Sequence, residues 1–399
     1  MPADRSPPQL VTLILMTALS VLSLNMFLPS LARMATDFGT DYAVVNLSIA
    51  GYLAVSAVLQ IIMGPLSDRY GRRPVMLAGF AIFTMASLGC ALADNVWLFL
   101  AFRMAQGAVV AGSVLSRAVI RDMHDERSAA ALMGYVAMAM AIAPMMGPLI
   151  GGLLEQFIHW RASFVFYALG GLGLLIWGWL DLGETNLQKS ETFAAQFRAY
   201  PELLRSRRFW GYSICTMFSV GAFYIFLGGA PLAAQSAWSL EPAWLGVGMG
   251  CTTAGFFVGN WISGRISQAY PLVTLMIAGR WVTLAGLGAG LVLLLAGLDH
   301  PVTFFGAVVA IGIGNGLTLP AGNSGAMSVR PRLAGSASGL SGALQIGGGA
   351  VLSTLAGVAV RGENGVVVLM LLLLGCSALS LVAALYVRWV DRREPLPAA

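Results

Sequence analysis

The sequence reads GPLSDRYGRR from Gly64 to Arg73 and connects two long apolar runs, residues 43–65 and 75–93. Each run is long enough to cross a bilayer as a helix, which takes about 20 apolar residues. The connection carries four charged residues next to segments that lie in lipid, and such charges require partners or water. We therefore expect a membrane-spanning helical hairpin whose charged connection contacts other parts of the protein.

The composition of the whole chain is that of a membrane protein. Of its 399 residues, 58% are apolar and 10% are charged, against roughly 25% charged in a soluble domain, and the mean hydropathy is +0.78. A soluble domain cannot bury so much apolar surface, which excludes a soluble enzyme, a secreted disulfide scaffold and a disordered chain. The basic residues lie between the apolar runs, so no nucleic-acid partner is expected. The four cysteines lie inside apolar runs without metal-ligand spacing, and we expect no metal, cofactor or disulfide.

Reading for apolar runs of spanning length predicts twelve transmembrane helices. Their predicted ranges are 10–31, 43–65, 75–93, 96–118, 129–154, 162–181, 210–233, 243–263, 272–297, 302–325, 335–360 and 364–388. One long polar gap divides them into six and six. We therefore expect an all-α membrane fold of two six-helix parallel repeats around a central cavity: an N-terminal bundle over 1–181, a cytoplasmic central loop over 182–209 and a C-terminal bundle over 210–399.

The distribution of Lys and Arg predicts which ends of the spans face the cytoplasm. With the N-terminus inside, 18 of the 23 basic residues fall in cytoplasmic segments. Arg33, Arg161 and Arg361 fall outside, and Arg103 and Arg280 fall within spans. The positive-inside rule then predicts that both termini are cytoplasmic.

The charged connection after the second span is a candidate gate. Gly64 would let two helices approach closely, Asp68 suits the positive N-terminus of a neighbouring helix, and Arg72 suits a nearby carboxylate. Such contacts favour one closed arrangement of the cytoplasmic side. The alternative is a solvated turn that only sets the orientation. The candidate gate residues in this connection are Gly64, Asp68, Arg69, Gly71, Arg72 and Arg73.

The fifth span combines prolines with small residues. It reads APMMGPLIGG from Ala143 to Gly152, so its glycines form a strip at helical spacing that allows tight helix contact. Pro144 and Pro148 each remove a backbone hydrogen bond and bend a helix. The pattern predicts a tightly packed, bent helix that limits leakage; the alternative is ordinary helix packing. The residues concerned are Pro144, Gly147, Pro148, Gly151 and Gly152.

These motifs resemble those of the major facilitator superfamily. The charged connection resembles the signature loop of that superfamily, and RMAQG (103–107) resembles its RxxQG element. The segment 143–152 resembles its "antiporter" element. NMFLPSL (25–31), SRAVIRD (116–122), HWRASF (159–164) and RLAGSASGL (332–340) are similar to the drug:proton antiporter branch, of the Bcr/CflA type. The resemblance implies multidrug efflux across a bacterial inner membrane, and hence antibiotic resistance, in exchange for protons. It also implies a charge relay of Asp68, Arg72 and Asp122, with Arg121 beside it; the alternative for Asp122 is a plain charge at a helix end. A monomer is expected.

Arg103 is the costliest residue to place in the membrane, because a central Arg costs at least about 2.5–3.5 kcal/mol to insert. We expect it to share one polar cluster with Asn25 and Gln106 in the N-terminal bundle. A purely structural Arg is the alternative. Arg280 lies 8 residues from the inner end of its predicted span, 272–297, and snorkelling to the interface is expected. Gln106-Gly107 and Asn315-Gly316 are a candidate match between the two repeats.

No Asp or Glu lies in the middle of a predicted span, and Asn25 stands where many relatives of this branch carry an acid. Proton coupling therefore rests on the resemblance, with Asp68 or Asp122 as the expected site. A cavity with an Arg and no acid disfavours lipophilic cations, so neutral or zwitterionic amphiphiles, phenicol-like or bicyclomycin-like, are the expected substrates. The remaining candidates for the cavity lining, each alternatively a packing residue, are Tyr52, Tyr135, Phe223, Tyr224, Asn315 and Gln345.

Other functions are less consistent with the sequence. A transporter of the same fold that carries a sugar, nucleoside or siderophore is the main alternative. A membrane-embedded enzyme would need a catalytic cluster inside the spans, and a channel has no use for two moving halves. No nucleotide-binding motif is present, so transport is expected to be secondary.

Overall fold

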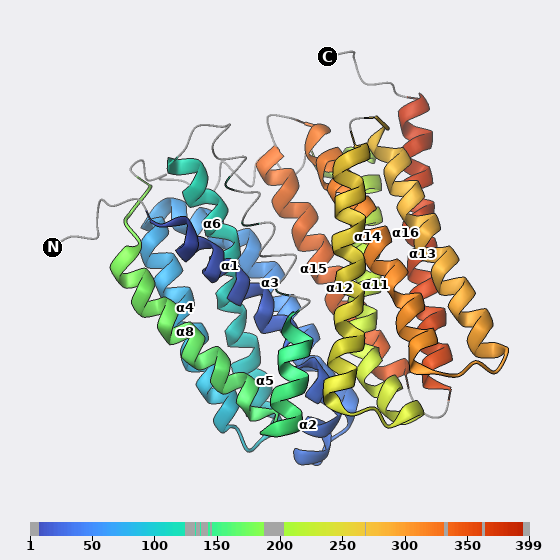
Figure 1. Ribbon diagram of the computed structural model, residues 1–399. Helices are drawn as coiled ribbons and strands as arrows, with labels where there is room; N and C mark the ends of the chain where they lie inside the picture. Colours follow the sequence, from blue (N-terminus) through green and yellow to red (C-terminus); the bar gives the residue numbers. More distant parts are fainter. Residues whose placement is uncertain are drawn as a thin grey trace. The chain divides into compact units, whose positions relative to one another are not determined.

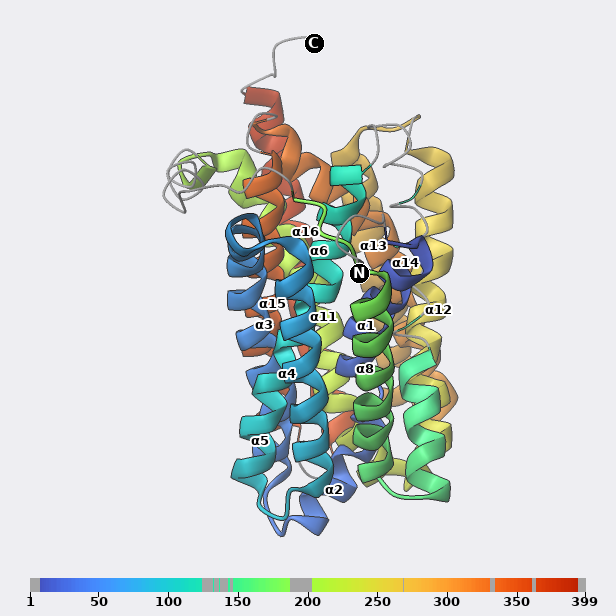
Figure 2. The same cartoon turned by 90° about the vertical axis from the view of Figure 1, so that its left-hand side faces the viewer.

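The computed structural model describes residues 8–123, 132, 136, 143, 146–186, 203–267, 269–330, 334–360 and 364–393, without the side chains of Arg121 and 334–336. Over these residues the chain is helical and contains no strand (Figures 1 and 2). It divides into two compact units. Unit 1 comprises Met1–Ala194 with Glu241–Val247, and unit 2 comprises Ala195–Leu240 with Gly248–Ala399.

The helices of unit 1 follow the predicted spans. They are α1 (Leu10–Asn25), η1 (Leu28–Ser30), α2 (Leu31–Asp37), α3 (Tyr42–Tyr70), α4 (Arg72–Leu92), α5 (Val96–Ala105), η2 (Gln106–Val109), α6 (Val110–Met123), the helical residues 146–157 and α8 (Arg161–Asp181). The first span extends beyond its predicted end at residue 31. Helix α1 ends at Asn25, and after η1 the span continues as α2 to Asp37. Helices α4 and α8 lie side by side, as Figure 2 shows.

The helices of unit 2 also match the predicted ranges. They are α11 (Arg207–Trp238), α12 (Pro242–Ile266), whose first residues belong to unit 1, α13 (Leu272–Leu295), α14 (Pro301–Ser328), α15 (Ala334–Ala359) and α16 (Gly365–Arg393). Ten helical segments among the described residues are long and apolar enough to cross a membrane. Most of the predicted fifth span lies outside the described residues, and α12 occupies the predicted eighth.

Aromatic rings fill the core of unit 1. Trp160, which has no exposed surface, contacts the rings of Phe38, Phe99 and Phe164 at centroid distances of 5.3–5.9 Å. The contacts with Phe99 and Phe164 are edge-to-face and that with Phe38 is tilted, and edge-to-face contacts add to the stabilisation from apolar burial. The cluster joins α2, α5 and α8 and fixes the end of the unit opposite the charged connection (Figure 1).

Small residues set the packing of unit 2. A Cβ atom on Gly279 of α13 would lie 2.6 Å from the carbonyl oxygen of Gly314 on α14. Both positions therefore require glycine, because the two backbones touch. This contact places the polar side chains that follow Gly279 and Gly314 next to one another.

Candidate functional site

The charged connection is almost entirely helical, so the expectation of a loop over Gly64–Arg73 is wrong. Helix α3 continues to Tyr70 and α4 begins at Arg72. Gly71 alone lies between them, with φ 105° and ψ 153°, a conformation that is essentially restricted to glycine. The chain therefore reverses direction at one residue, and this reversal directs Arg72 back toward the end of α3.

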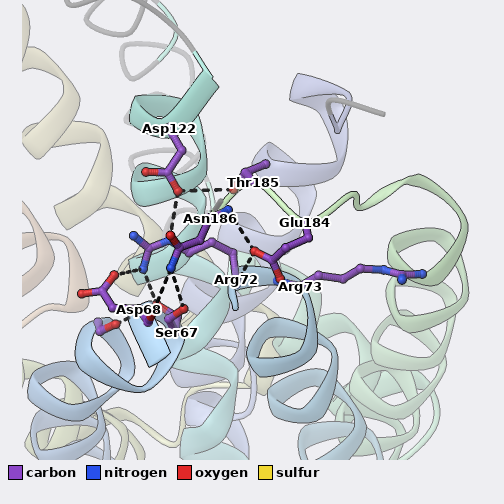
Figure 3. A network of polar contacts seen from close by, with 9 residues as sticks. Ser67, Asp68, Arg72, Arg73, Asp122, Glu184, Thr185 and Asn186 are labelled. Atoms are coloured by element: carbon purple, nitrogen blue, oxygen red, sulfur yellow. Dashed lines mark hydrogen bonds and ion pairs between the residues drawn. The ribbon is translucent and has the colours of Figure 1, made fainter. Parts of the chain in front are cut away.

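Arg72 lies between two carboxylates from different helices. Its Nη1 atom is 2.5 Å from Asp68 Oδ1 on α3, and its Nε atom is 3.0 Å from Asp122 Oδ2 on α6. The Arg72 side chain is only 12% exposed, and each carboxylate is 25% exposed, so solvent screens these pairs less than surface pairs. The three residues that the family resemblance places in a charge relay thus lie together (Figure 3).

Glu184, which the sequence analysis did not single out, caps the start of α4. Its Oε1 atom accepts hydrogen bonds from the backbone N–H groups of Arg72 (2.9 Å) and Asn186 (2.9 Å), and its Oε2 atom accepts one from Arg73 (3.3 Å; Figure 3). The first N–H groups of a helix have no partner within the helix, and a carboxylate there also meets the positive end of the helix dipole. A Cβ atom on Gly71 would collide with this carboxylate.

The next two residues bind the other side of the same turn. Asn186 Nδ2 donates to the backbone oxygens of Asp68 (3.0 Å) and Ser67 (3.4 Å), which end α3. Thr185 Oγ1 donates to Asp122 Oδ2 at 3.3 Å. We call Glu184–Asn186 the clasp. This segment begins three residues after the end of α8 and binds the end of α3, the start of α4 and the relay carboxylate of α6 (Figure 3). Capping residue types after the sixth span were the only signal in the sequence.

The other predicted gate residues have simpler surroundings. The Arg73 guanidinium donates to the Trp179 carbonyl oxygen at 3.0 Å and lies over the Trp179 ring, and Arg69 lies over the Tyr70 ring. The expected close contact at Gly64 is wrong, because a Cβ atom there would have no neighbour within 4 Å in the described part of the chain. The carboxylate at the N-terminus of α4 is Glu184, not Asp68, and the Arg121 side chain lies outside the described residues.

Arg103 occupies a closed polar cluster in unit 1. Its side chain has no exposed surface. Nη1 donates to Gln106 Oε1 (2.7 Å) and Nη2 donates to the Ser23 carbonyl oxygen (2.9 Å), while the guanidinium lies 4.1 Å from the Tyr52 ring centroid and 4.5 Å from that of Phe27. Two aromatic faces and two acceptors thus compensate the buried cation.

The cluster contains Gln106 as expected, but the expected hydrogen-bonded place for Asn25 is wrong. Asn25 is 2% exposed and its Oδ1 atom has no hydrogen-bond partner among the described residues. The carbonyl group of Ser23, two residues earlier, binds Arg103 instead, because α1 ends at Asn25 and turns its last side chain toward the helix of residues 146–157. A Cβ atom on Gly147 of that helix would lie 3.2 Å from Asn25 Cβ.

Arg280 is buried in unit 2, so the expectation that it snorkels to the interface is wrong. It has no exposed surface, Nε donates to Thr318 Oγ1 (3.0 Å), and Nη2 donates to Asn315 Oδ1 (2.9 Å). The contact at Gly279 and Gly314 brings these partners within reach. Gln106 and Asn315, the candidate match between the repeats, each accept a hydrogen bond from a buried arginine.

The remaining predicted cavity residues lie in unit 2 or outside the described residues. Gln345 Nε2 on α15 donates to Asn323 Oδ1 (2.9 Å) and Thr216 Oγ1 (3.2 Å). The rings of Phe223 and Tyr224 contact each other at 6.1 Å, and Tyr224 packs against Gly349. Tyr135 lies outside the described residues.

The glycines of the fifth span make tight contacts within unit 1. A Cβ atom on Gly151 would collide with the Met26 carbonyl oxygen, and one on Gly152 with that of Pro242, a residue of the same unit. Together with Gly147 they pack backbone against backbone, as the small-residue strip predicts. Pro148 lies in the same helix, and Pro144 lies outside the described residues.

Known proteins are similar to this chain in sequence and in fold. Residues 13–354 match the Major Facilitator Superfamily. The chain is 29% identical to the Multidrug resistance protein D of Escherichia coli (strain K12), over 94% of this chain and 95% of that protein. It is 32% identical to a Chloramphenicol resistance protein of Pseudomonas aeruginosa over 53% of this chain and 51% of that protein. Its fold is similar to the crystal structure of a D-xylose-proton symporter, with a TM-score of 0.77 at 14% identity over 95% and 96% of the two chains; this likeness concerns the fold alone.

Proposed function

Because the chain belongs to the Major Facilitator Superfamily and is therefore a multi-pass membrane transporter of small molecules, we propose that it exports amphiphilic drugs by alternating access. The proposed substrates are neutral or zwitterionic, phenicol-like or bicyclomycin-like compounds. Relatives named for multidrug and chloramphenicol resistance support this substrate class. The proposed transporter is of the Bcr/CflA type and is a monomer. Its proposed location is the bacterial inner membrane, with both termini cytoplasmic.

The observation that carries the proposal is the position of Arg72 between Asp68 and Asp122. Three helices are joined there through one guanidinium, and the clasp holds the turn that presents it. Partly buried ion pairs of this kind stabilise one arrangement of the helix ends and are lost when the helices separate. The cluster is therefore the proposed cytoplasmic gate of an alternating-access cycle.

Proton exchange is proposed to act through the same carboxylates. Protonation of Asp68 or Asp122 would remove one partner of Arg72 and weaken the closed arrangement. This places the coupling proton at the gate, away from the substrate. The proposed direction is export of drug against entry of protons.

The substrate preference follows from the charge of the buried clusters. Arg103 and Arg280 have no carboxylate among their partners in the described part of the chain, so neither buried cluster supplies a counter-charge that would favour a cationic substrate. The residues proposed to contact the substrate are those named from the sequence: Asn25, Tyr52, Arg103, Gln106, Tyr135, Phe223, Tyr224, Asn315 and Gln345.

Transport in proteoliposomes under an imposed pH gradient tests the proposal. We expect chloramphenicol to move against its gradient only while the pH gradient lasts, with an uncoupler abolishing the movement and with ethidium transported more slowly. Asp122→Asn should make transport less dependent on the pH gradient, and Arg103→Ala should lose export at normal expression. Equal or faster ethidium transport would overturn the substrate class, and full export by Arg103→Ala would remove Arg103 from the function.

The second candidate is a metabolite carrier, since the xylose symporter shares the fold. The two candidates differ in cells that overexpress the protein. Export of drugs raises resistance to a phenicol, whereas a metabolite carrier changes growth on a single sugar or nucleoside and leaves drug resistance unchanged.

A further inference from the structure

We propose that Arg280 in unit 2 is an anion-binding residue that takes the carboxylate of an amphiphilic substrate. This proposal rests on the proposed export function and makes it more specific: among zwitterionic or weakly acidic drugs, the anionic group is bound by unit 2.

Arg280 is a buried cation without a counter-charge. It is fully buried, and its hydrogen-bond partners are the hydroxyl of Thr318 and the amide oxygen of Asn315, both neutral. Its Nη1 atom has no hydrogen-bond partner among the described residues. An unpaired charge inside a membrane protein is costly and indicates a functional role with a specific partner.

Arg103 and Arg280 each have one guanidinium nitrogen without a hydrogen-bond partner among the described residues, Nε in Arg103 and Nη1 in Arg280, but they differ in what else compensates the charge. Both guanidinium groups are fully buried, and each donates to a side-chain amide oxygen, Arg103 to that of Gln106 and Arg280 to that of Asn315. The Arg103 group also lies between the rings of Tyr52 and Phe27. No aromatic ring lies over Arg280 in the part of the chain that the structure describes, so only hydrogen bonds from two of its nitrogens compensate its charge.

The surroundings of Arg280 orient it without neutralising it. Asn315 Oδ1 already accepts from Ser219 Oγ on α11 at 2.7 Å as well as from Arg280. Thr318 is buried and lies 3.4 Å from the Met276 carbonyl oxygen. The Nε and Nη2 edge of the guanidinium is therefore fixed by α14, which leaves Nη1 as the group available to donate to a ligand.

A carboxylate is the chemistry that suits this group. Hydrogen bonds between arginine and a carboxylate are charge-assisted and are roughly twice as strong as neutral ones. A lipophilic cation would be repelled. Since Arg280 has no exposed surface in this structure, the proposal requires that α11 separates from α14 within unit 2, which breaks the Ser219–Asn315 hydrogen bond and admits the anion.

The test measures binding directly, with two aromatic probes of nearly the same size that differ in charge. Purified full-length protein in detergent is heated at pH 7 with 2-naphthoate, with 2-naphthamide, or with sodium sulfate at matched ionic strength, and the unfolding midpoint is followed by tryptophan fluorescence. A ligand that binds the folded state raises the midpoint. We expect naphthoate alone to raise it in the wild type and in Arg265→Gln, which removes an exposed arginine of the same unit.

Two variants at the site make the expectation specific. Arg280→Gln should bind naphthoate about tenfold or more weakly, the loss that corresponds to one charge-assisted hydrogen bond. Asn315→Asp supplies an internal carboxylate, so it should raise the midpoint without ligand and abolish the naphthoate shift; it tests the proposal even where Arg280→Gln fails to fold.

The proposal is overturned if the wild type shows no naphthoate shift, if naphthamide or sulfate gives an equal shift, or if Arg280→Gln or Asn315→Asp keeps the full shift. The assay needs no transport. Loss of drug export by a protein that still binds naphthoate through Arg280 would therefore contradict the exporter and leave the anion site intact.

Discussion

Glu184 accepts hydrogen bonds from the backbone of Arg72, a residue 112 positions earlier in the chain, and from that of Arg73. The carboxylate of one segment thus completes the first turn of a helix from another. Because Arg72 is the residue that joins Asp68 to Asp122, the cap and the ion pairs share one turn of backbone. The position of the proposed gate therefore depends on the segment that leads from α8 into the central part of the chain.

Removing the charge of Glu184 should weaken the gate. Glu184→Gln keeps one acceptor oxygen but loses the charge at the N-terminus of α4, which is worth about 0.3–1 kcal/mol. Glu184→Ala loses both acceptors, and a lost N-terminal cap costs about 1 kcal/mol. We expect the unfolding midpoint to fall from the wild type to the Gln variant to the Ala variant. The rate of proton leak through proteoliposomes should rise in the same order. Asp94→Asn, which removes a carboxylate that is 97% exposed, is the control and should match the wild type; an unchanged leak in both Glu184 variants would contradict the role of the clasp.

Gly71→Ala should destabilise unit 1, although it adds only one methyl group. The backbone conformation at Gly71 is one that a residue with a Cβ atom adopts only at a cost of order 1–3 kcal/mol, and the new methyl group would also displace the Glu184 carboxylate. We expect a lower unfolding midpoint together with the proton leak of Glu184→Ala. Gly288→Ala is a matched control, because a Cβ atom there has no neighbour within 4 Å and Ala is the better helix former. A Gly71→Ala protein as stable as the control would show that the turn tolerates a side chain.

The spans could be predicted from the sequence because bilayer thickness sets their length. Residues 162–181 were expected as one helix and Arg161–Asp181 is observed; the same holds for α13, which begins at Leu272 as expected. Helix α3 continues beyond its predicted end at residue 65, through polar and charged residues, to Tyr70. Asn186 donates hydrogen bonds to two carbonyl groups of this last turn, which stabilises it.

Contacts between distant segments could not be predicted in the same way. The sequence shows that Glu184 and Asn186 are capping residue types, but not which helix ends they reach. For Arg280 the distance to the end of its span suggested the interface, whereas its direction is set by the rotation of α13 against α14, which depends on the contact of Gly279 with Gly314. Hydropathy carries no information about that rotation.

The pH dependence of stability should include a contribution from Glu155. Burial raises the pKa of this carboxyl, while the nearby charges of His159 and Arg33 oppose the rise and that of Asp37 adds to it. A carboxyl whose folded-state pKa is raised binds its proton more tightly in the folded state, so its contribution to stability is lost as the pH rises from its ordinary pKa of about 4.3 through the folded-state value.

Glu155→Gln removes that titration. We expect the variant and the wild type to have similar free energies of unfolding near pH 4 and the variant to be the more stable at pH 7, with the difference growing between these values. Denaturant unfolding of both proteins at a series of pH values measures this difference in the free energy of unfolding. A difference that stays constant with pH, or shrinks as the pH rises, contradicts the assignment.

Asn25→Asp should extend the substrates to lipophilic cations. Asn25 is buried with its Oδ1 atom unpartnered, and the substitution changes its charge with almost no change in shape. A carboxylate at this position supplies the negative charge that the proposed path otherwise lacks. We expect ethidium export to rise roughly tenfold, which corresponds to about 1.4 kcal/mol of attraction, while chloramphenicol export changes little. Asn260→Asp, which adds the same charge on α12, should leave both unchanged. Unaltered ethidium export by a folded Asn25→Asp protein would mean that this side chain does not face the transport path, and the substrate preference would then have to arise from Arg103 and Arg280 alone.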